Sequence, residues 1–280
     1  MALNLTMLGE HMAVAASGID LATRPAPATA AALRQALLDH LVLCIRGQTL
    51  SPPAYRDAMG IFGAPLPQTR IASQHPEIPE IMILSSADRD ELGDGGRLVV
   101  GAHWHTDDSY KAVPCSLTML YGVAVPQTGG DTQFTNMYAA YDGLDAATKR
   151  RLEGLKAIHQ YDSSRKGTRI ATLTSGETAQ LPAVVHPLVR THPETGRRAL
   201  YLNPNRMEAV AGLNRPASDA LLDTLIAHAI QPRYQYRHRW QAGDILIWDN
   251  RCTMHKANAD YPLDATRLMH RIIVAGTVPA

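Results

Sequence analysis

The sequence lacks a dominant charge of either sign. Its 280 residues contain 27 lysines and arginines against 26 aspartates and glutamates, so the formal net charge is +1 at pH 7. Proteins that hold a phosphate backbone or an anionic membrane without sequence specificity carry a strong positive field, which is missing here. Nucleic acid and membrane surfaces are therefore not expected as partners.

Long apolar runs are missing as well. No stretch approaches the ~18 apolar residues that a membrane-spanning helix needs, and the N-terminal segment has neither the basic start nor the apolar core of a secretory signal. Cysteines are few, because only Cys44, Cys115 and Cys252 occur, far apart and without Cys-x-x-Cys spacing. This pattern indicates buried thiols in a reduced compartment rather than disulfides or a zinc site. We expect a cytoplasmic protein.

Repeats, low-complexity tracts and Gly/Ser linkers are also absent, so nothing marks a boundary between domains. The hydrophobic content of 45% and the charged content of 19% are typical of a globular protein with a packed core. Barrels and sandwiches commonly reach roughly 200–250 residues as one unit. Residues 1–280 are therefore predicted to form a single catalytic domain.

Short β-type segments dominate the sequence after residue 80. They cover residues 81–84, 116–125, 184–189, 199–202, 233–240, 244–248 and 270–276, with turn residues between them. A further strand is predicted at 41–45. Helical patterns occur at 28–40, after Ser51, near 137–155 and at 216–230. Many short strands with few helices predict a jelly-roll barrel or sandwich with helices packed outside.

Twelve histidines are many for a chain of this length, and two of them lie close to an aspartate. Side chains alternate with a period of two in an extended segment, so His103, His105 and Asp107 would share one face there. His105 and Asp107 would then reach one metal ion from the same side. The best candidate for a third ligand is His255. Two imidazoles and one carboxylate leave three positions of an octahedron open, as non-haem Fe(II) oxygenases require.

A His-x-Asp triplet arises often by chance, and three further features support a metal site. Arg267 lies beyond His255 in a predicted strand, where a buried guanidinium needs an anion and suits a carboxylate. Residues 129–132 form a turn into a strand that places the Thr132 hydroxyl beside such an anion. The third feature is the order of these segments along the chain: the His-x-Asp triplet, residues 129–132, the segment with His255, and then Arg267 and Arg271. Arg271 would lie on the same strand face as Arg267.

Six motifs follow one another along the chain. They are WHTD (104–107), GGDT (129–132), AAYDGL (139–144), HPLVRTHPETGR (186–197), WDNRCTMH (248–255) and RLMHR (267–271). SGIDL at 17–21 and FG at 62–63 extend the pattern over nearly the whole sequence. With these motifs the sequence resembles the taurine and 2,4-dichlorophenoxyacetate dioxygenase family of Fe(II)/2-oxoglutarate enzymes.

The resemblance implies a mainly β fold, with a double-stranded β-helix (jelly roll) core and flanking helices. It implies that His105, Asp107 and His255 hold Fe(II). It also implies that Arg267 and Thr132 bind 2-oxoglutarate, and that O2 is used to hydroxylate a small organic substrate with release of succinate and CO2. Related halogenases lack the carboxylate ligand, so the presence of Asp107 favours hydroxylation. The family also suggests a homo-oligomer.

The substrate-binding positions differ from those of the taurine enzyme. Arg271 matches the arginine that holds the sulfonate, whereas Gly101 replaces an asparagine and Gln68 stands where that enzyme has a histidine. Arg206 lies where that enzyme places an aromatic wall, and it is either a second clamp for a substrate carboxylate or a solvent-exposed residue. We therefore expect a small anionic substrate other than taurine, such as a sulfonate, an aryloxyalkanoate or another carboxylate. Hydroxylation beside a heteroatom would allow cleavage of the bond to that heteroatom.

Two alternative interpretations remain open. A cupin-like metal enzyme would use His103, His105 and His255 without 2-oxoglutarate, whereas the family resemblance leaves His103 as a residue that lines the substrate pocket. A non-catalytic anion-binding barrel would keep the fold without the chemistry. In addition, residues 163–182 are polar and lack periodicity, and we interpret them as a lid over the site.

Overall fold

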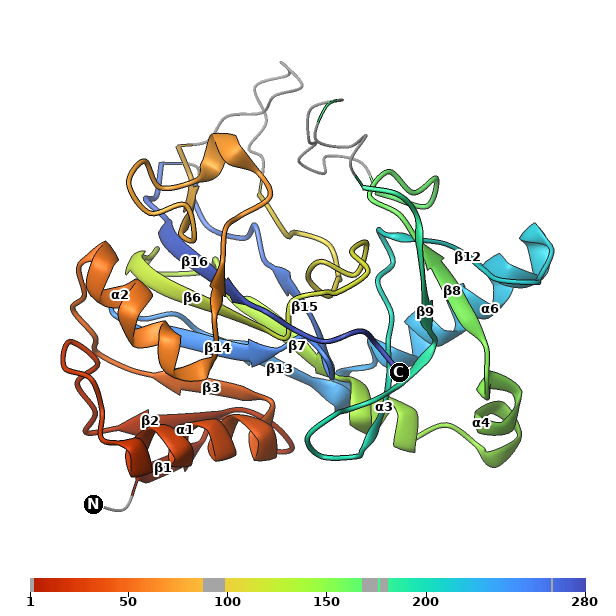
Figure 1. Ribbon diagram of the computed structural model, residues 1–280, viewed down its shortest axis with the longest axis horizontal. Coiled ribbons are helices and arrows are strands. Elements are labelled where there is room, and N and C mark those ends of the chain that lie inside the picture. The colour runs from red at the N-terminus through yellow and green to blue at the C-terminus, as the bar shows by residue number, and fades with distance from the viewer. Residues whose placement is uncertain (1–2, 88–98, 168–175, 177–180, 263) are drawn as a thin grey trace.

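Two sheets form the centre of the computed structural model, which describes residues 3–87, 99–167, 176, 181–262 and 264–280 (Figure 1). The larger sheet has the order β1 (Asn4–Met7), β2 (Val14–Ser17), β3 (Val42–Ile45), β14 (Ile245–Asp249), β6 (Leu117–Ala124), β16 (Leu268–Val274) and β4 (Pro65–Leu66), with β5 (Met82–Ser85) also paired to β16. The smaller sheet has the order β13 (Gln235–His238), β7 (Thr132–Asn136) and β15 (Thr253–Ala257). The mainly β fold with a jelly-roll core is confirmed.

Alternating residues of the larger sheet pack in two separate apolar cores. On β14, Ile245 and Ile247 belong to the core on the outer face of the sheet, whereas Leu246 and Trp248 belong to the core between the sheets. The inner core includes Phe134 from the smaller sheet, whose ring centroid lies 5.5 Å from that of Trp248. Because side chains alternate along a strand, a continuous apolar run such as residues 245–248 fits a strand that is buried on both faces.

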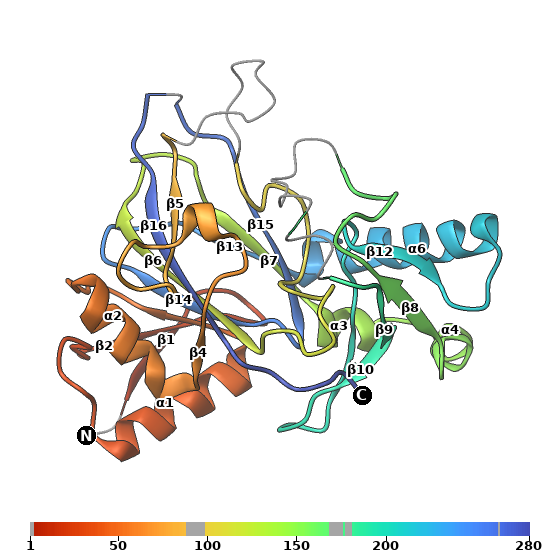
Figure 2. The same cartoon turned by 45° about the horizontal axis from the view of Figure 1, so that its top comes forward.

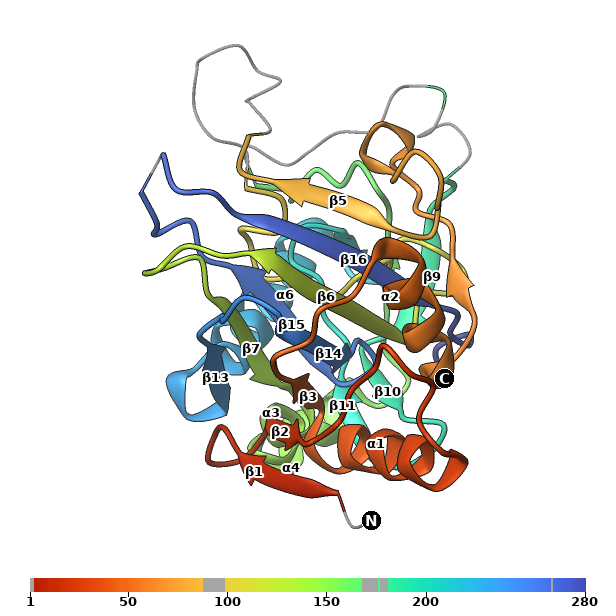
Figure 3. The same cartoon turned by 90° about the vertical axis from the view of Figure 1, so that its left-hand side faces the viewer.

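Two helices cover the outer face of the larger sheet, α1 (Pro27–His40) and α2 (Pro52–Met59) (Figure 3). Each begins with proline, whose missing N–H would be unpaired in the first turn anyway. The Ser51 hydroxyl caps α2 by accepting a hydrogen bond from the Ala54 amide at 3.4 Å. The predicted helices here, and the strand between them, are confirmed.

A third layer stands beside the jelly roll (Figure 2). Its sheet has the order β12 (Met207–Val210), β8 (Lys156–His159) and β9 (Val184–Pro187), and α6 (Arg215–Ala229) packs on β12. The remaining elements are α3 (Met137–Asp142), α4 (Ala146–Leu152), the hairpin of β10 (Val189–Thr191) and β11 (Arg198–Leu200), and the 3-10 turns η1 (Gly60–Phe62), η2 (Ile71–Ser73) and η3 (Pro232–Tyr234). This layer closes one side of the cavity described below.

Several predicted elements differ from the structure in extent. The helical pattern near 137–155 forms two helices, because Gly143 ends α3 and the Asp145 side chain caps a new helix by accepting from the Thr148 amide at 2.8 Å. The predicted strand at 184–189 is split into β9 and β10. Six strands, β1, β2, β4, β8, β12 and β15, were not predicted, and each is at most five residues long.

The three cysteines are free and buried, as predicted. Within the described ranges, no helix combines the length and the apolar character needed to cross a membrane. The predicted lid at 163–182 falls largely on 168–175 and 177–180, which lie outside the described residues. The single domain and the homo-oligomer stay predictions.

Gly129 provides a test of the turn that leads into β7. Its φ is 73°, and an added Cβ would lie 2.2 Å from the Asp260 carbonyl oxygen, whereas Gly18 has a φ of 74° with open space around it. Both alanine variants carry the left-handed penalty of about 1 kcal/mol, but only Gly129→Ala adds a steric clash of about 2 kcal/mol. Urea unfolding is expected to show the larger loss for Gly129→Ala, and equal losses would contradict the close approach.

Candidate metal centre

A backbone bridge places two histidines side by side between the sheets. The His105 amide donates to the His255 carbonyl at 3.0 Å, and the His255 amide donates to the His105 carbonyl at 2.8 Å. Directly opposed residues of an antiparallel pair project their side chains to the same face. The two imidazole centroids consequently lie only 4.2 Å apart. Because His255 belongs to β15, the bridge fixes His105 against the smaller sheet.

Asp107 reaches the same place through a turn. Between residues 103 and 107 the only β-type pairing is the single bridge at His105, and a turn begins at Asp107. Asp108 follows with a φ of 55°, in the left-handed region. Regular β pairing is therefore limited to His105, and the side chains of His105 and Asp107, two residues apart, lie on the same side just before the turn.

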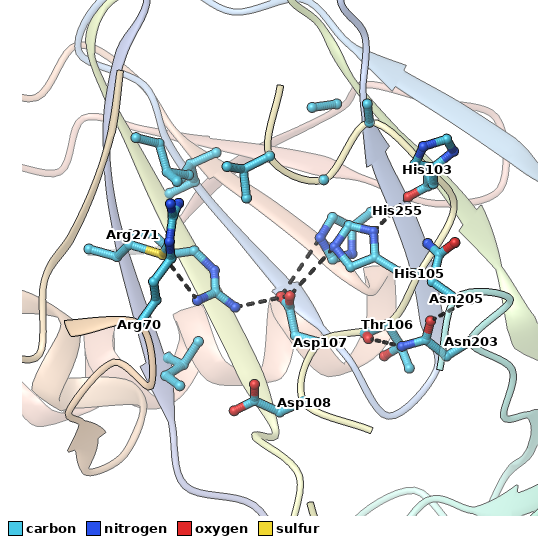
Figure 4. A pocket seen from close by; sticks show the side chains of 18 of the residues that line it. Arg70, His103, His105, Thr106, Asp107, Asp108, Asn203, Asn205, His255 and Arg271 are labelled. Carbon is cyan, nitrogen blue, oxygen red and sulfur yellow. Dashed lines mark hydrogen bonds and ion pairs between the residues drawn. The ribbon is translucent and has the colours of Figure 1, made fainter. Parts of the chain in front are cut away.

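The atoms of His105, Asp107 and His255 that are able to bind a metal lie within 4.8 Å of one another (Figure 4). Asp107 Oδ1 is 3.6 Å from His105 Nε2, and Asp107 Oδ2 is 3.7 Å from His255 Nε2. Asp107 and His255 are buried and His105 is half-buried. The structure thus brings together the three residues that the sequence predicts as ligands.

Neighbouring groups hold Asp107 as a carboxylate. The Thr118 hydroxyl donates to Oδ2 at 2.6 Å, and the Arg271 guanidinium donates to Oδ1 at 2.9 Å. Asn250 donates to Thr118 at 2.8 Å and accepts from the Trp248 indole at 3.1 Å. Burial raises the pKa of Asp107, but the nearby Arg271 and the two histidines outweigh it, so the pKa lies well below its usual value.

The imidazoles of His105 and His255 each have a nitrogen that is able to bind a metal. His105 Nδ1 is hydrogen-bonded to the His103 carbonyl at 2.7 Å, which makes Nδ1 the protonated nitrogen and leaves the Nε2 lone pair facing Asp107. His255 Nδ1 is buried and has no hydrogen-bond partner among the described residues. Burial lowers the pKa of His255 well below its usual value, and His105 lowers it further, so the imidazole is neutral. Two imidazoles and one carboxylate form a donor set that fits Fe(II).

Two other groups in the described part of the chain bring metal-binding side chains together: Cys44, His238 and Asp244, and His192, Asp249 and Cys252. The carboxylates of both groups are engaged in ion pairs within the protein. Asp244 pairs with Arg46 at 2.7 Å and with His238, and Asp249 pairs with Arg251 at 2.6 Å and with His192. Burial also raises the pKa of the Cys44 thiol to about 12. These groups are better described as buried hydrogen-bond networks.

A cavity of about 200 Å³ opens onto the candidate metal centre. Its apolar wall includes Met82, Leu84, Val99, Val100, Leu120, Trp248 and Ile273. Its polar wall includes all the site residues that the sequence predicts, namely Gln68, His103, His105, Asp107, Thr132, Arg206, His255, Arg267 and Arg271.

Arg267 is buried in this cavity, with 7% of its surface exposed, and its Nε donates to the Gly130 carbonyl at 3.3 Å. Among the described residues no carboxylate lies within ion-pair distance of it, and burial lowers its pKa. Thr132 lines the same cavity, and its hydroxyl accepts a hydrogen bond from the Trp240 indole at 3.0 Å. This bond orients the hydroxyl so that its own proton is available to a neighbouring anion.

The other predicted substrate-binding residues already have protein partners. Arg271 donates to Gln68 Oε1 at 2.8 Å as well as to Asp107, so it stands between the metal centre and Gln68. Arg206 stacks 3.9 Å from the Tyr161 ring and donates to the Tyr161 carbonyl. Both guanidiniums line the cavity, and Arg271 is paired with the Asp107 carboxylate, whereas Arg206 contacts the carbonyl and the ring of Tyr161.

His103 lines the cavity but is not a member of the three-residue cluster. It is exposed, and its carbonyl, rather than its ring, contacts His105. The alternative ligand set of His103, His105 and His255 is therefore not the set whose atoms converge. Gly101 faces the centre closely, since an added Cβ would lie 3.2 Å from His105 Cε1. A larger side chain at this position would press on the His105 ring.

Sequence reasoning missed the residues that support Asp107, especially Thr118, Asn250 and Asn203. Thr118 is the polar residue inside an otherwise apolar strand, and Asn250 lies within the WDNRCTMH motif. Asn203 is buried and donates to the Thr106 carbonyl at 2.7 Å. A polar residue within an otherwise apolar segment, such as Thr118, is the sequence signal for a buried side chain that supports a site residue.

Buried neutral histidines away from the cluster make the fold sensitive to mild acid. Burial lowers the pKa of His159 to about 3, and burial also lowers the pKa of His186 and His238. In the unfolded chain these groups titrate near pH 6.5. The unfolded state then binds protons below that pH while the folded state does not, so His159 alone costs about 1.4 kcal/mol of stability per pH unit between about pH 6.5 and its folded pKa.

We therefore expect urea unfolding of the wild-type protein to give a free energy several kcal/mol lower at pH 5 than at pH 7. His159→Asn keeps an N–H for Ser109, which His159 Nδ1 contacts at 3.1 Å, and reduces this pH dependence by about 2 kcal/mol. His11→Asn, on an exposed side chain, serves as the control. An unchanged slope in His159→Asn would argue against a neutral buried imidazole.

Comparison with known proteins identifies the family. Residues 5–273 match the family described as taurine catabolism dioxygenase TauD, TfdA family. Pentalenolactone F synthase from Streptomyces arenae is 35% identical over 261 residues, which is 88% of this chain and 86% of that protein. The alpha-ketoglutarate-dependent 2,4-dichlorophenoxyacetate dioxygenase of Cupriavidus pinatubonensis is 39% identical over 168 residues, or 60% of this chain and 58% of that enzyme.

A solved structure agrees with these relatives. The crystal structure of AAD-2 in complex with Mn(II) and N-oxalylglycine superposes with a TM-score of 0.83 at 31% sequence identity, covering 100% of this chain and 99% of that chain. The matched family segment takes in every strand of the jelly roll except the first residue of β1 and the last of β16, and it includes all the residues of the candidate metal centre. The chain therefore belongs to the TauD, TfdA family of taurine catabolism dioxygenases.

Proposed function

We propose that this protein is an enzyme that hydroxylates a small anionic organic molecule at a metal centre formed by His105, Asp107 and His255. Family membership makes it an Fe(II)- and 2-oxoglutarate-dependent dioxygenase. The observation that carries the proposal is the buried Arg267, which has no carboxylate partner in the described residues and lies in the same cavity as the three ligands. A buried guanidinium without an anion needs a ligand to compensate its charge.

The enzyme uses Fe(II), 2-oxoglutarate and O2. When bound, these supply the oxidation that inserts one oxygen atom into a substrate C–H bond while 2-oxoglutarate is converted to succinate and CO2. N-oxalylglycine, present in the AAD-2 structure, has the skeleton of 2-oxoglutarate with one methylene replaced by N–H. Its two carboxylates are the groups that a cavity with a metal at one end and an arginine at the other accommodates.

The residues around the metal centre keep its ligands in the protonation states that Fe(II) needs. Asp107 is ionised and accepts the Thr118 hydrogen bond, which fixes the rotation of the carboxylate. His105 presents Nε2 because its Nδ1 proton is bonded to the His103 carbonyl. Orientation of ligands by such outer partners typically changes metal affinity or activity by about 10–100-fold.

Arg267 and Thr132 are proposed to hold the distal carboxylate of 2-oxoglutarate. The Gly130 carbonyl anchors Arg267 Nε, so the two terminal nitrogens of the guanidinium remain for a carboxylate. The Thr132 proton is available because the Trp240 indole already satisfies its oxygen. Burial of both side chains removes competing water and strengthens these charge-assisted hydrogen bonds.

The charges around the cavity favour an anionic substrate. The described lining carries four arginines against two aspartates: Arg70, Arg206, Arg267 and Arg271 against Asp107 and Asp108. The charges of Fe(II) and of the 2-oxoglutarate dianion cancel, so the positive excess remains when both are present. We propose that Arg271, oriented by Gln68, meets the substrate anion beside the metal, and that Arg206 and His103 form the opposite wall.

The test is an anaerobic titration of the purified protein with Fe(II) and 2-oxoglutarate, followed by a screen for succinate release. Sulfonates, aryloxyalkanoates, other carboxylates and their neutral amide or ester analogues form the panel. The proposal expects a charge-transfer absorption band on titration, and substrate-dependent succinate formation with anions only. Absence of metal binding, or equal stimulation by neutral analogues, would contradict it.

A further inference from the structure

The turn that carries Asp107 is conformationally strained. Asp108, the next residue, has a φ of 55°, which costs a non-glycine residue free energy unless surrounding contacts compensate. Its carboxylate is engaged within the same turn, because it accepts from Tyr110 at 3.1 Å and from Lys111 at 2.8 Å. Lys111 also links this turn to a distant segment, because its ammonium donates to the Thr69 hydroxyl at 2.8 Å.

One amide nitrogen from outside the turn bridges the strained residue. Asn203 Nδ2 donates to the Thr106 carbonyl at 2.7 Å and to Ser109 Oγ at 2.9 Å, so its two protons are bound on either side of Asp107 and Asp108. Figure 4 shows the Asn203 side chain beside Thr106, with Asp107 adjacent. The bridge therefore spans the ligand and the strained residue together.

Asn203 is itself fixed in this position. It is 2% exposed, and its Oδ1 accepts from the Asn205 amide at 3.3 Å, which determines the orientation of the side-chain amide. Ser109 is fully buried and is hydrogen-bonded in turn to His159 Nδ1 at 3.1 Å. The bridge is thus part of a buried network that joins the turn to β8.

We propose that Asn203 is a positioning residue of the metal centre, which holds the turn of residues 106–109 so that the Asp107 carboxylate points at His105 and His255. This inference rests on the proposed function. Among the described residues Asn203 forms no hydrogen bond with the donor atoms of the three ligands, and it acts through the Thr106 carbonyl and the Ser109 hydroxyl of the turn. Loss of the bridge removes two of the hydrogen bonds that hold this turn, so Asp108 is less constrained to the left-handed region and the Asp107 carboxylate is less well aligned.

The experiment measures binding of Mn(II) alone to metal-free protein by calorimetric titration, and the absorption band of the anaerobic Fe(II)/2-oxoglutarate complex. Asn203→Asp keeps the size of the side chain but removes both N–H donors, and Asn203→Ala removes them without adding charge. Both are expected to weaken Mn(II) binding by about 10–100-fold and to shift the absorption band. Ser109→Ala removes one of the two bonds and is expected to give a smaller change.

The matched control is Asn214→Ala, which removes an asparagine hydrogen bond to the Ala217 amide at the start of α6, on an exposed residue. It is expected to lower the melting temperature while Mn(II) affinity stays within twofold of wild type. Wild-type Mn(II) affinity and an unshifted band in folded Asn203→Ala and Ser109→Ala would overturn the positioning role. Failure of the proposed function gives a different result, because the wild-type protein itself then binds no Mn(II) or binds it equally well after His255→Ala.

Discussion

Asp107→Asn is expected to abolish metal binding and to lower succinate formation by about 10³-fold or more. The amide keeps the volume of the carboxylate but not its charge, so one of three protein ligands is lost. The change also leaves Arg271, which donates to Asp107 at 2.9 Å, without its acidic partner. Breaking a buried ion pair on one side typically costs about 3–5 kcal/mol, so the variant is expected to be less stable as well.

The double variant Asp107→Asn/Arg271→Met separates the two effects. It removes the unpaired guanidinium together with the carboxylate, and replacement of both members of a buried pair is often neutral or stabilising. We expect the double variant to regain most of the lost stability in thermal melts. Calorimetric titration with Mn(II) should still show no binding. Asp57→Asn, on a carboxylate that is 72% exposed, is the control. Turnover at the wild-type rate in Asp107→Asn would refute the metal assignment.

The jelly roll could be predicted because its strands are marked by local patterns. The run at residues 245–248 is apolar throughout and forms a strand buried on both faces. The short strand β15 could not be predicted in the same way. It exists because its residues pair with β7, which is distant in sequence, and the resulting bridge to His105 depends on the tertiary fold.

Motifs located the candidate ligands, whereas strand periodicity alone would also have included His103. An extended segment puts His103, His105 and Asp107 on one face, but the chain bends at His103, which lies outside the cluster. A left-handed residue such as Asp108 is not visible in a sequence, because aspartate is compatible with many backbone conformations. The family resemblance nevertheless identified Asp107 as a ligand, since it compares the positions of residues in motifs and does not depend on the local backbone conformation.

Partners of buried polar side chains were the least predictable part of the site. Alternation along an extended segment placed Arg267, directly before β16, and Arg271, within it, toward one cavity, which is where both are found. It could not show that Arg271 pairs with Asp107 and Gln68, because these contacts join segments separated by 164 and 203 residues in the sequence numbering. Thr118 likewise depends on Asn250 from a neighbouring strand end for its orientation.

Arg267→Met is expected to change stability and cosubstrate affinity in opposite directions. Arg267 is 7% exposed and has no carboxylate partner in the described ranges, so its burial costs free energy in the ligand-free protein. Methionine has a similar length and no charge. We expect it to raise the free energy of unfolding of the ligand-free protein by on the order of 1–2 kcal/mol, and with it the melting temperature.

Binding of 2-oxoglutarate should weaken in the same variant. A carboxylate that loses a buried guanidinium partner typically loses about 2–5 kcal/mol of binding free energy, which corresponds to an affinity lower by on the order of 10²–10³-fold. The measurement is a pair of melting curves, with and without Mn(II) and 2-oxoglutarate, together with the KM for 2-oxoglutarate. Arg24→Met, on an exposed residue, should change neither quantity.

The combination of results is what tests the role of Arg267. A purely structural arginine would lower the stability of the ligand-free protein when removed, because its contact with the Gly130 carbonyl would be lost without compensation. Removal of an arginine that is kept for an anionic ligand lowers the stability only of the complex, since the desolvation of the guanidinium is compensated only when the carboxylate is present. A less stable ligand-free variant with an unchanged KM would therefore assign 2-oxoglutarate to another cation of the cavity.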